Sequence, residues 1–127
     1  MAILRSHHIA VATPNLKRLV DFYTNVLALP EVGHIGPTIT FIDIGGTRLE
    51  LIEKPDATEP QEENRKGPMH IAFEVDDVQK TYEEFKAKGV EFYIPAREAR
   101  PGLWVAFFRD PDGNALEFFQ ATPEAIK

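Results

Sequence analysis

Residues 8–23, HIAVATPNLKRLVDFY, have a counterpart 62 positions later in residues 70–85, HIAFEVDDVQKTYEEF. Each copy opens with the alternation of a strand and continues with residues at the i, i+3, i+4, i+7 spacing of one helix face. Those helix-face residues are Leu16, Leu19, Val20 and Tyr23 in the first copy and Val78, Thr81, Tyr82 and Phe85 in the second. This internal repetition predicts two copies of one supersecondary unit.

The residues around each helical stretch predict where the helices begin and end. Thr13-Pro14 offers an N-cap followed by proline at the first helical position, and Asp76 or Asp77 offers the cap of the second helix. Gly89 is placed to end that second helix, since glycine readily adopts the left-handed conformation after a helix.

The second half of each copy also repeats. The series Phe41, Gly46, Leu49-Glu50 aligns with Phe108, Gly113, Leu116-Glu117 at a constant offset of 67. In both series a strand-like run enters a glycine-containing turn and leaves as another strand, which predicts a hairpin.

We therefore expect an α+β protein built from two strand–helix–strand–strand–strand (βαβββ) modules in a single domain, residues 1–127. The first module spans residues 1–54 and the second spans residues 68–121. Residues 55–67 between them are polar and contain prolines, which is typical of a linker.

Composition excludes several classes of protein. The 127 residues carry 14 Lys+Arg against 20 Asp+Glu, a net charge of −6, with no basic run of the kind that binds nucleic acid. No apolar stretch approaches the length of a membrane span, and the N-terminus alternates like a strand, unlike a signal peptide. We expect a cytoplasmic protein that binds neither nucleic acid nor membrane. The absence of cysteine excludes thiolate ligands, so any metal is bound by His, Asp or Glu.

Strand alternation places four repeated polar residues on equivalent faces. His8 lies opposite the Ile9/Val11 face, and His70 lies opposite the Ile71/Phe73 face. Glu50 and Glu117 are likewise each flanked by apolar residues that are expected to point to the core. All four side chains are therefore predicted to project from the side of their sheets that carries no helix.

Two imidazoles and two carboxylates suit one divalent ion such as Ni²⁺, Zn²⁺, Mn²⁺, Co²⁺ or Fe²⁺. Four protein ligands in an octahedral site leave two positions for water or substrate, as Lewis-acid catalysis requires. The alternative is that the histidines are ordinary strand residues and the glutamates are solvated surface charges.

The segments HHIAVATPNLKRLVDFYTNVLAL, RLELIE, MHIAFEVDDV and FFRDPDGNALEFF resemble the vicinal-oxygen-chelate (VOC) superfamily. This superfamily includes glyoxalase I, methylmalonyl-CoA epimerase, extradiol dioxygenases and fosfomycin- and bleomycin-resistance proteins. The resemblance covers roughly residues 5–120. It implies paired βαβββ modules that form a U-shaped mixed sheet around one metal ion, a small-molecule substrate and a homodimer. The family's metal ligands fall on His8, Glu50, His70 and Glu117.

The His/Glu/His/Glu set resembles that of glyoxalase I, or lactoylglutathione lyase. It implies a metal-dependent lyase or isomerase in which Glu50 and Glu117 move a proton of a small oxygenated substrate. Bacterial glyoxalase I carries a glutathione-binding arginine where this chain has Ala12, which argues against a glutathione adduct. Two alternatives stay open: an Fe²⁺ dioxygenase, which needs only His8, His70 and Glu117, and a non-catalytic resistance protein that sequesters a drug or metabolite.

Five further residues are candidates for contact with the substrate. Arg48 and Arg100 offer positive charge for an anionic group, and Ile52, Trp104 and Phe119 are candidate walls of a cavity. Exposed surface charge is the alternative for each arginine, and ordinary core packing is the alternative for the apolar residues.

Overall fold

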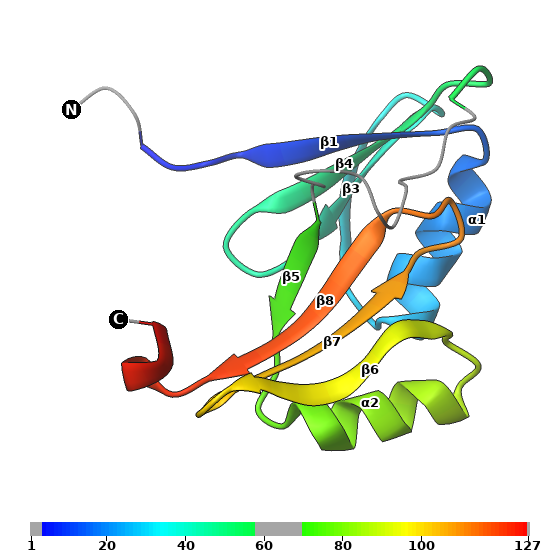
Figure 1. Ribbon diagram of the computed structural model, residues 1–127. Helices are drawn as coiled ribbons and strands as arrows, with labels where there is room; N and C mark the ends of the chain where they lie inside the picture. The colour runs from blue at the N-terminus through cyan, green and yellow to red at the C-terminus, as the bar shows by residue number, and fades with distance from the viewer. Residues whose placement is uncertain (1–3, 58–69, 127) are drawn as a thin grey trace. The chain divides into compact units, whose positions relative to one another are not determined.

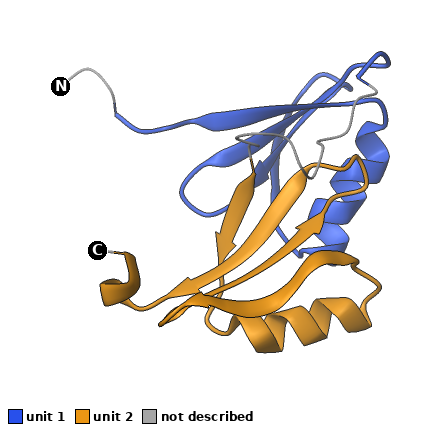
Figure 2. Cartoon of the chain, viewed as in Figure 1, with its two compact units in different colours: residues 1–59 blue, residues 60–127 orange. Residues whose placement is uncertain are grey.

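The computed structural model describes residues 4–57 and 70–126 (Figure 1). The chain divides into two compact units, Met1–Glu59 and Pro60–Lys127 (Figure 2). The module limits at residues 54 and 68 stay predictions, and residues 58–67 of the predicted linker lie outside the described residues.

Unit 1 contains one helical segment and one four-stranded sheet. Its elements are β1 (His8–Thr13), α1 (Leu16–Asp21), the π-helical turn η1 (Phe22–Val26), β2 (Glu31–Ile35), β3 (Ile39–Asp43) and β4 (Arg48–Glu53). The strands lie in the order β1-β4-β3-β2, with β1 parallel to β4 and the other neighbours antiparallel. Helix α1 packs against β4.

Unit 2 repeats the same order of elements. They are β5 (Ile71–Glu74), α2 (Val78–Ala87), β6 (Phe92–Arg100), β7 (Leu103–Arg109), β8 (Ala115–Ala121) and the short 3₁₀ helix η2 (Pro123–Ile126). The strands lie in the order β5-β8-β7-β6, with β5 parallel to β8, and α2 packs on one face of this sheet (Figure 1). The predicted α+β fold of two βαβββ modules is confirmed. No helix among the described residues is long and apolar enough to cross a membrane.

The helix ends agree with the sequence in unit 2 and differ in unit 1. Asp77 Oδ1 accepts a hydrogen bond from the Lys80 N–H at 3.0 Å, and Gly89 has a φ of 92° just after α2. The predicted N-cap at Thr13 is wrong, because Asn15 caps α1 by accepting from the Arg18 N–H. Thr13 Oγ1 accepts instead from the Asn15 N–H and so fixes the turn that precedes the helix.

The core residues follow the predicted alternation except at one edge strand. Leu49, Leu51, Leu116 and Phe118 are all less than 5% exposed, as expected for the helix-facing side of each sheet. Ile9 was expected in the core as well but is 39% exposed. It lies on β1, which is the edge of its sheet, while the six-residue helix α1 contacts mainly β4.

The two hairpins differ by one residue in their turns, and this changes which phenylalanines are equivalent. Phe41 on β3 pairs with Glu50, whereas Phe107 on β7 pairs with Glu117. The predicted equivalence of Phe41 with Phe108 is therefore wrong by one position, because residues 110–114 form a longer turn than residues 44–47. Phe108 lies on the other face of the sheet and is fully buried.

Candidate metal centre

In unit 1 the two predicted metal ligands lie side by side. His8 begins β1 and Glu50 lies on the neighbouring strand β4, where it pairs with Ala10. The His8 Nε2 and Glu50 Oε1 atoms are 3.4 Å apart, and their side chains are 38% and 13% exposed. The strand pairing therefore brings these two side chains together from positions 42 residues apart in the sequence.

Unit 2 repeats this arrangement. His70 directly precedes β5, and Glu117 lies on β8, the strand that pairs with β5. The His70 Nε2 and Glu117 Oε1 atoms are 3.1 Å apart, with side-chain exposures of 40% and 8%. Since Leu116 and Phe118 on either side of Glu117 are buried in the core, the carboxylate projects from the opposite face of the sheet.

Each pair has the spacing of two ligands of one metal ion. With metal–ligand distances of about 2.1 Å, neighbouring donor atoms lie about 3.0 Å apart in an octahedral site and about 3.4 Å apart in a tetrahedral one. The observed separations of 3.4 Å and 3.1 Å fit that range, and imidazole nitrogen with carboxylate oxygen is a suitable donor set. Within either unit, the described residues supply a pair of ligands and no group of three or more.

An aromatic ring packs against each of these histidines. The Phe41 ring centroid is 5.8 Å from that of His8, and the Phe107 ring centroid is 5.6 Å from that of His70. Both contacts are edge-to-face with an interplanar angle of 73°. The sequence did not point to Phe107, because the constant offset of 67 aligns Phe41 with Phe108 and the longer second turn follows only from the strand pairing.

His7 gives His8 a second contact. The two Nδ1 atoms are 3.0 Å apart, so one of them carries the proton and the other accepts. A histidine that binds metal through Nε2 commonly uses Nδ1 in such a bond, and His7 supplies the partner here.

The Glu117 carboxyl is buried, and this burial changes its acidity. Removal from water raises the pKa of Glu117 above its usual value of 4.5, while His70 acts in the opposite direction through its charge and hydrogen bond. A raised pKa makes this carboxylate a better proton acceptor than an exposed one.

This shift predicts a pH dependence of stability in the metal-free protein. A carboxyl with a raised folded-state pKa favours the folded state while protonated, and that contribution is lost as pH rises through the folded-state pKa. We expect the melting temperature of the wild type to fall relative to that of Glu117→Gln as pH rises from about 4.5 to 7 with chelator present. A constant difference between the two proteins over this range would contradict the shift.

Three of the five candidate substrate residues share the face of the glutamate in their own unit. Arg48 and Ile52 lie on β4, each two residues from Glu50. Phe119 lies on β8, two residues from Glu117. Arg100 on β6 pairs with Leu103, next to a register shift in the pairing of β6 with β7. The Arg48 guanidinium also donates to the His7 carbonyl oxygen at 3.3 Å.

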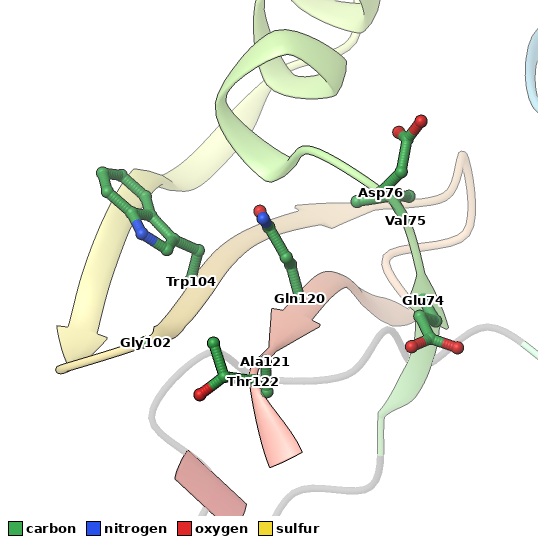
Figure 3. Close-up of a pocket in the computed structure, with 8 residues that line it drawn as sticks. All are labelled: Glu74, Val75, Asp76, Gly102, Trp104, Gln120, Ala121 and Thr122. Carbon is green, nitrogen blue, oxygen red and sulfur yellow. The ribbon is translucent and has the colours of Figure 1, made fainter. Parts of the chain in front are cut away.

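Trp104 lies on the other face of the unit 2 sheet. It pairs with Gln120, whose Oε1 accepts a hydrogen bond from the Val78 N–H at the start of α2. Figure 3 shows both side chains pointing to the same side of the sheet, the side on which the helix lies. Trp104 helps to line a pocket of about 380 Å³ formed by Glu74, Val75, Asp76, Gly102, Trp104, Gln120, Ala121 and Thr122. His70 and Glu117 are not part of that lining.

A protein-family model matches nearly the whole chain. The model of the Glyoxalase/Bleomycin resistance protein/Dioxygenase superfamily matches residues 5–118. The chain belongs to this superfamily. The resemblance to the VOC proteins inferred from the sequence motifs is thereby confirmed.

Several relatives of this chain carry the names of enzymes. A lactoylglutathione lyase of Neisseria meningitidis serogroup A is 35% identical over 130 aligned positions, which cover 92% of this chain and 91% of that protein. The human mitochondrial methylmalonyl-CoA epimerase is 31% identical over 97 aligned positions, which cover 68% of this chain. The chain spans only 54% of the length of the epimerase.

Solved structures of the superfamily share the fold. A lactoylglutathione lyase from Agrobacterium tumefaciens superposes with a TM-score of 0.68 over 94% of this chain and 95% of the other, at 21% sequence identity. At that level of identity the likeness establishes the fold alone.

Proposed function

We propose that this protein is a metal-dependent lyase or isomerase that transfers a proton on a small oxygenated substrate, as glyoxalases do. The observation that carries the proposal is the repetition of one His–Glu pair in both units, with Nε2–Oε1 separations of 3.4 Å and 3.1 Å. A single pair of this kind is common on a protein surface, but the same pair at equivalent positions of both units supports a shared chemical role.

We further propose that His8, Glu50, His70 and Glu117 bind one divalent ion, of Ni, Zn, Mn, Co or Fe. The donor atoms and their spacing within each unit support this ligand set. A bound ion of this kind supplies Lewis-acid polarisation of a substrate oxygen, which acidifies the adjacent C–H. The relation to a lactoylglutathione lyase and an epimerase also supports proton transfer as the reaction class.

The protein's own residues account for the proton transfer. Glu117 is the first candidate base, because its side chain is only 8% exposed and its Oε1 lies 3.1 Å from His70 Nε2. Glu50 is the second, since its side chain is only 13% exposed and occupies the equivalent position in unit 1. One carboxylate removes the proton and the other returns it in this scheme.

The residues beside the unit 1 glutamate favour a substrate other than a glutathione adduct. Ala12 pairs with Ile52, which pairs in turn with Ile39, so this end of the face is apolar. Arg48, beside His8, is the proposed contact for an anionic oxygen. Phe119 and Arg100 are the proposed contacts in unit 2, and Trp104, which pairs with Gln120 on the other face of the sheet, is not among the proposed contacts.

The experiment is an activity panel on the protein loaded in turn with Ni²⁺, Zn²⁺, Mn²⁺, Co²⁺ and Fe²⁺. It includes hemithioacetals, acyl-CoA epimers and catechols. Isomerisation, or exchange of a substrate C–H with D₂O, is the expected result. Oxygen consumption with catechols under Fe²⁺ would replace the proposal with the dioxygenase alternative. Tight binding of a panel compound without turnover would favour the sequestering protein.

A homodimeric assembly and a cytoplasmic location stay predictions.

A further inference from the structure

We propose that Phe41 and Phe107 are positioning residues that hold the imidazoles of His8 and His70 with Nε2 toward the paired glutamate. The importance of this positioning for catalysis rests on the proposed function. The ring contacts themselves are features of the structure and do not depend on that function.

The same three-residue arrangement occurs in both units. Phe41 pairs with Glu50 across β3 and β4, and its ring meets His8 edge-to-face. Phe107 pairs with Glu117 across β7 and β8, and its ring meets His70 at the same 73° angle. In each unit the strand that carries the glutamate thus lies between two other strands. The histidine lies at the start of one of them or directly before it, and the phenylalanine lies on the other. The repetition of this arrangement in two units of different local sequence indicates a shared role.

The histidines benefit from such support because their side chains are only partly buried. Each imidazole is about two-fifths exposed, and His70 lies one residue before β5 begins. Edge-to-face contacts at these centroid separations are favourable and directional, so they select one orientation of the ring. Phe107 is itself half-buried and packs against Tyr93 at 6.0 Å, which limits its own motion.

The two units differ in how many ring contacts they give the histidine. His8 contacts both Phe41 and His7, whereas Phe107 is the only aromatic contact of His70 among the described residues. We therefore expect replacement of Phe107 to have the larger effect. Changes to residues that orient metal ligands typically weaken metal affinity by about 10–100-fold, and we expect Phe107→Leu to fall in this range.

Phe108 provides a matched control, because it is the neighbouring phenylalanine on the opposite face. It is fully buried and packs against Phe118 with centroids 4.6 Å apart. The experiment titrates Co²⁺ into wild type, Phe107→Leu, Phe107→Tyr and Phe108→Leu and follows the visible absorption, with melting temperatures measured in parallel. We expect Phe107→Leu to weaken binding and alter the spectrum, Phe107→Tyr to bind like the wild type, and Phe108→Leu mainly to lower the melting temperature. Unchanged Co²⁺ affinity and spectrum in Phe107→Leu would overturn the inference.

A metal-free measurement separates this inference from the proposed function. Three-bond NMR couplings report whether the His70 side chain occupies one rotamer or averages over several. We expect one rotamer in the wild type and in Phe108→Leu, and averaging in Phe107→Leu. If no variant binds Co²⁺ but this pattern holds, the proposed function fails and the positioning role stands. If the couplings of Phe107→Leu match those of the wild type, the positioning role fails.

Discussion

Replacement of Glu117 by glutamine is expected to lower turnover by about 10²–10⁴-fold, the usual contribution of a general base. Glutamine keeps the size of the side chain and an oxygen that can still ligate a metal, but it cannot accept the proton. The 8% exposure of the Glu117 side chain means that water has little access to replace it. The measurement is kcat on the substrate that the panel identifies, with metal content determined on the same samples.

Glu74→Gln is the control for this substitution. Glu74 lies on β5 at even spacing from His70 and is exposed, and the proposed reaction does not use it. We expect kcat of this variant to match the wild type. If Glu117→Gln loses turnover only in proportion to its loss of metal, Glu117 acts as a metal ligand and not as the base. If turnover is undiminished, Glu117 takes no part in the reaction.

Replacement of His70 by alanine is expected to abolish metal binding by the whole chain, and His8→Ala is expected to do the same. If the four ligands share one ion, loss of either imidazole weakens the same site. A ligand present at 100 times its Kd stabilises the folded state by about 2.7 kcal/mol, so the metal-dependent rise in melting temperature should also disappear. Elemental analysis and melting curves with and without added metal measure both effects.

His34→Ala is the matched control, because His34 also forms a histidine–glutamate pair. Its Nε2 lies 2.7 Å from Glu31 Oε2, but the pair is on the edge strand β2 and has no counterpart in unit 2. This variant should retain the metal. Retention of half the metal by both His8→Ala and His70→Ala would contradict a shared ion and indicate two separate sites.

The shared face of each histidine and its glutamate could be predicted because it depends on strand alternation. The apolar residues Leu49 and Leu116 fix which face is buried, and the glutamate next to each must then face the other way. The repeat in turn identified which strands correspond. Both pairs lie within single units, where this local logic is sufficient.

Other features depend on details that residue patterns do not record. The equivalence of Phe107 with Phe41 depends on a turn that is one residue longer in unit 2. The cap at Asn15 could not be predicted, because Thr13 Oγ1 already accepts a hydrogen bond from the Asn15 N–H and the sequence does not show this bond. The position of Trp104 could not be read from LWVAFF, because a strand that is apolar at every position has no alternation to reveal its faces.

The most direct test of the central claim is a metal titration of the chelator-stripped wild type with Ni²⁺, Co²⁺, Mn²⁺ and Zn²⁺, followed by elemental analysis. The account predicts saturation close to one ion per chain and a higher melting temperature for the metal that binds. Absence of bound metal, with no rise in melting temperature for any of the four ions, would contradict it.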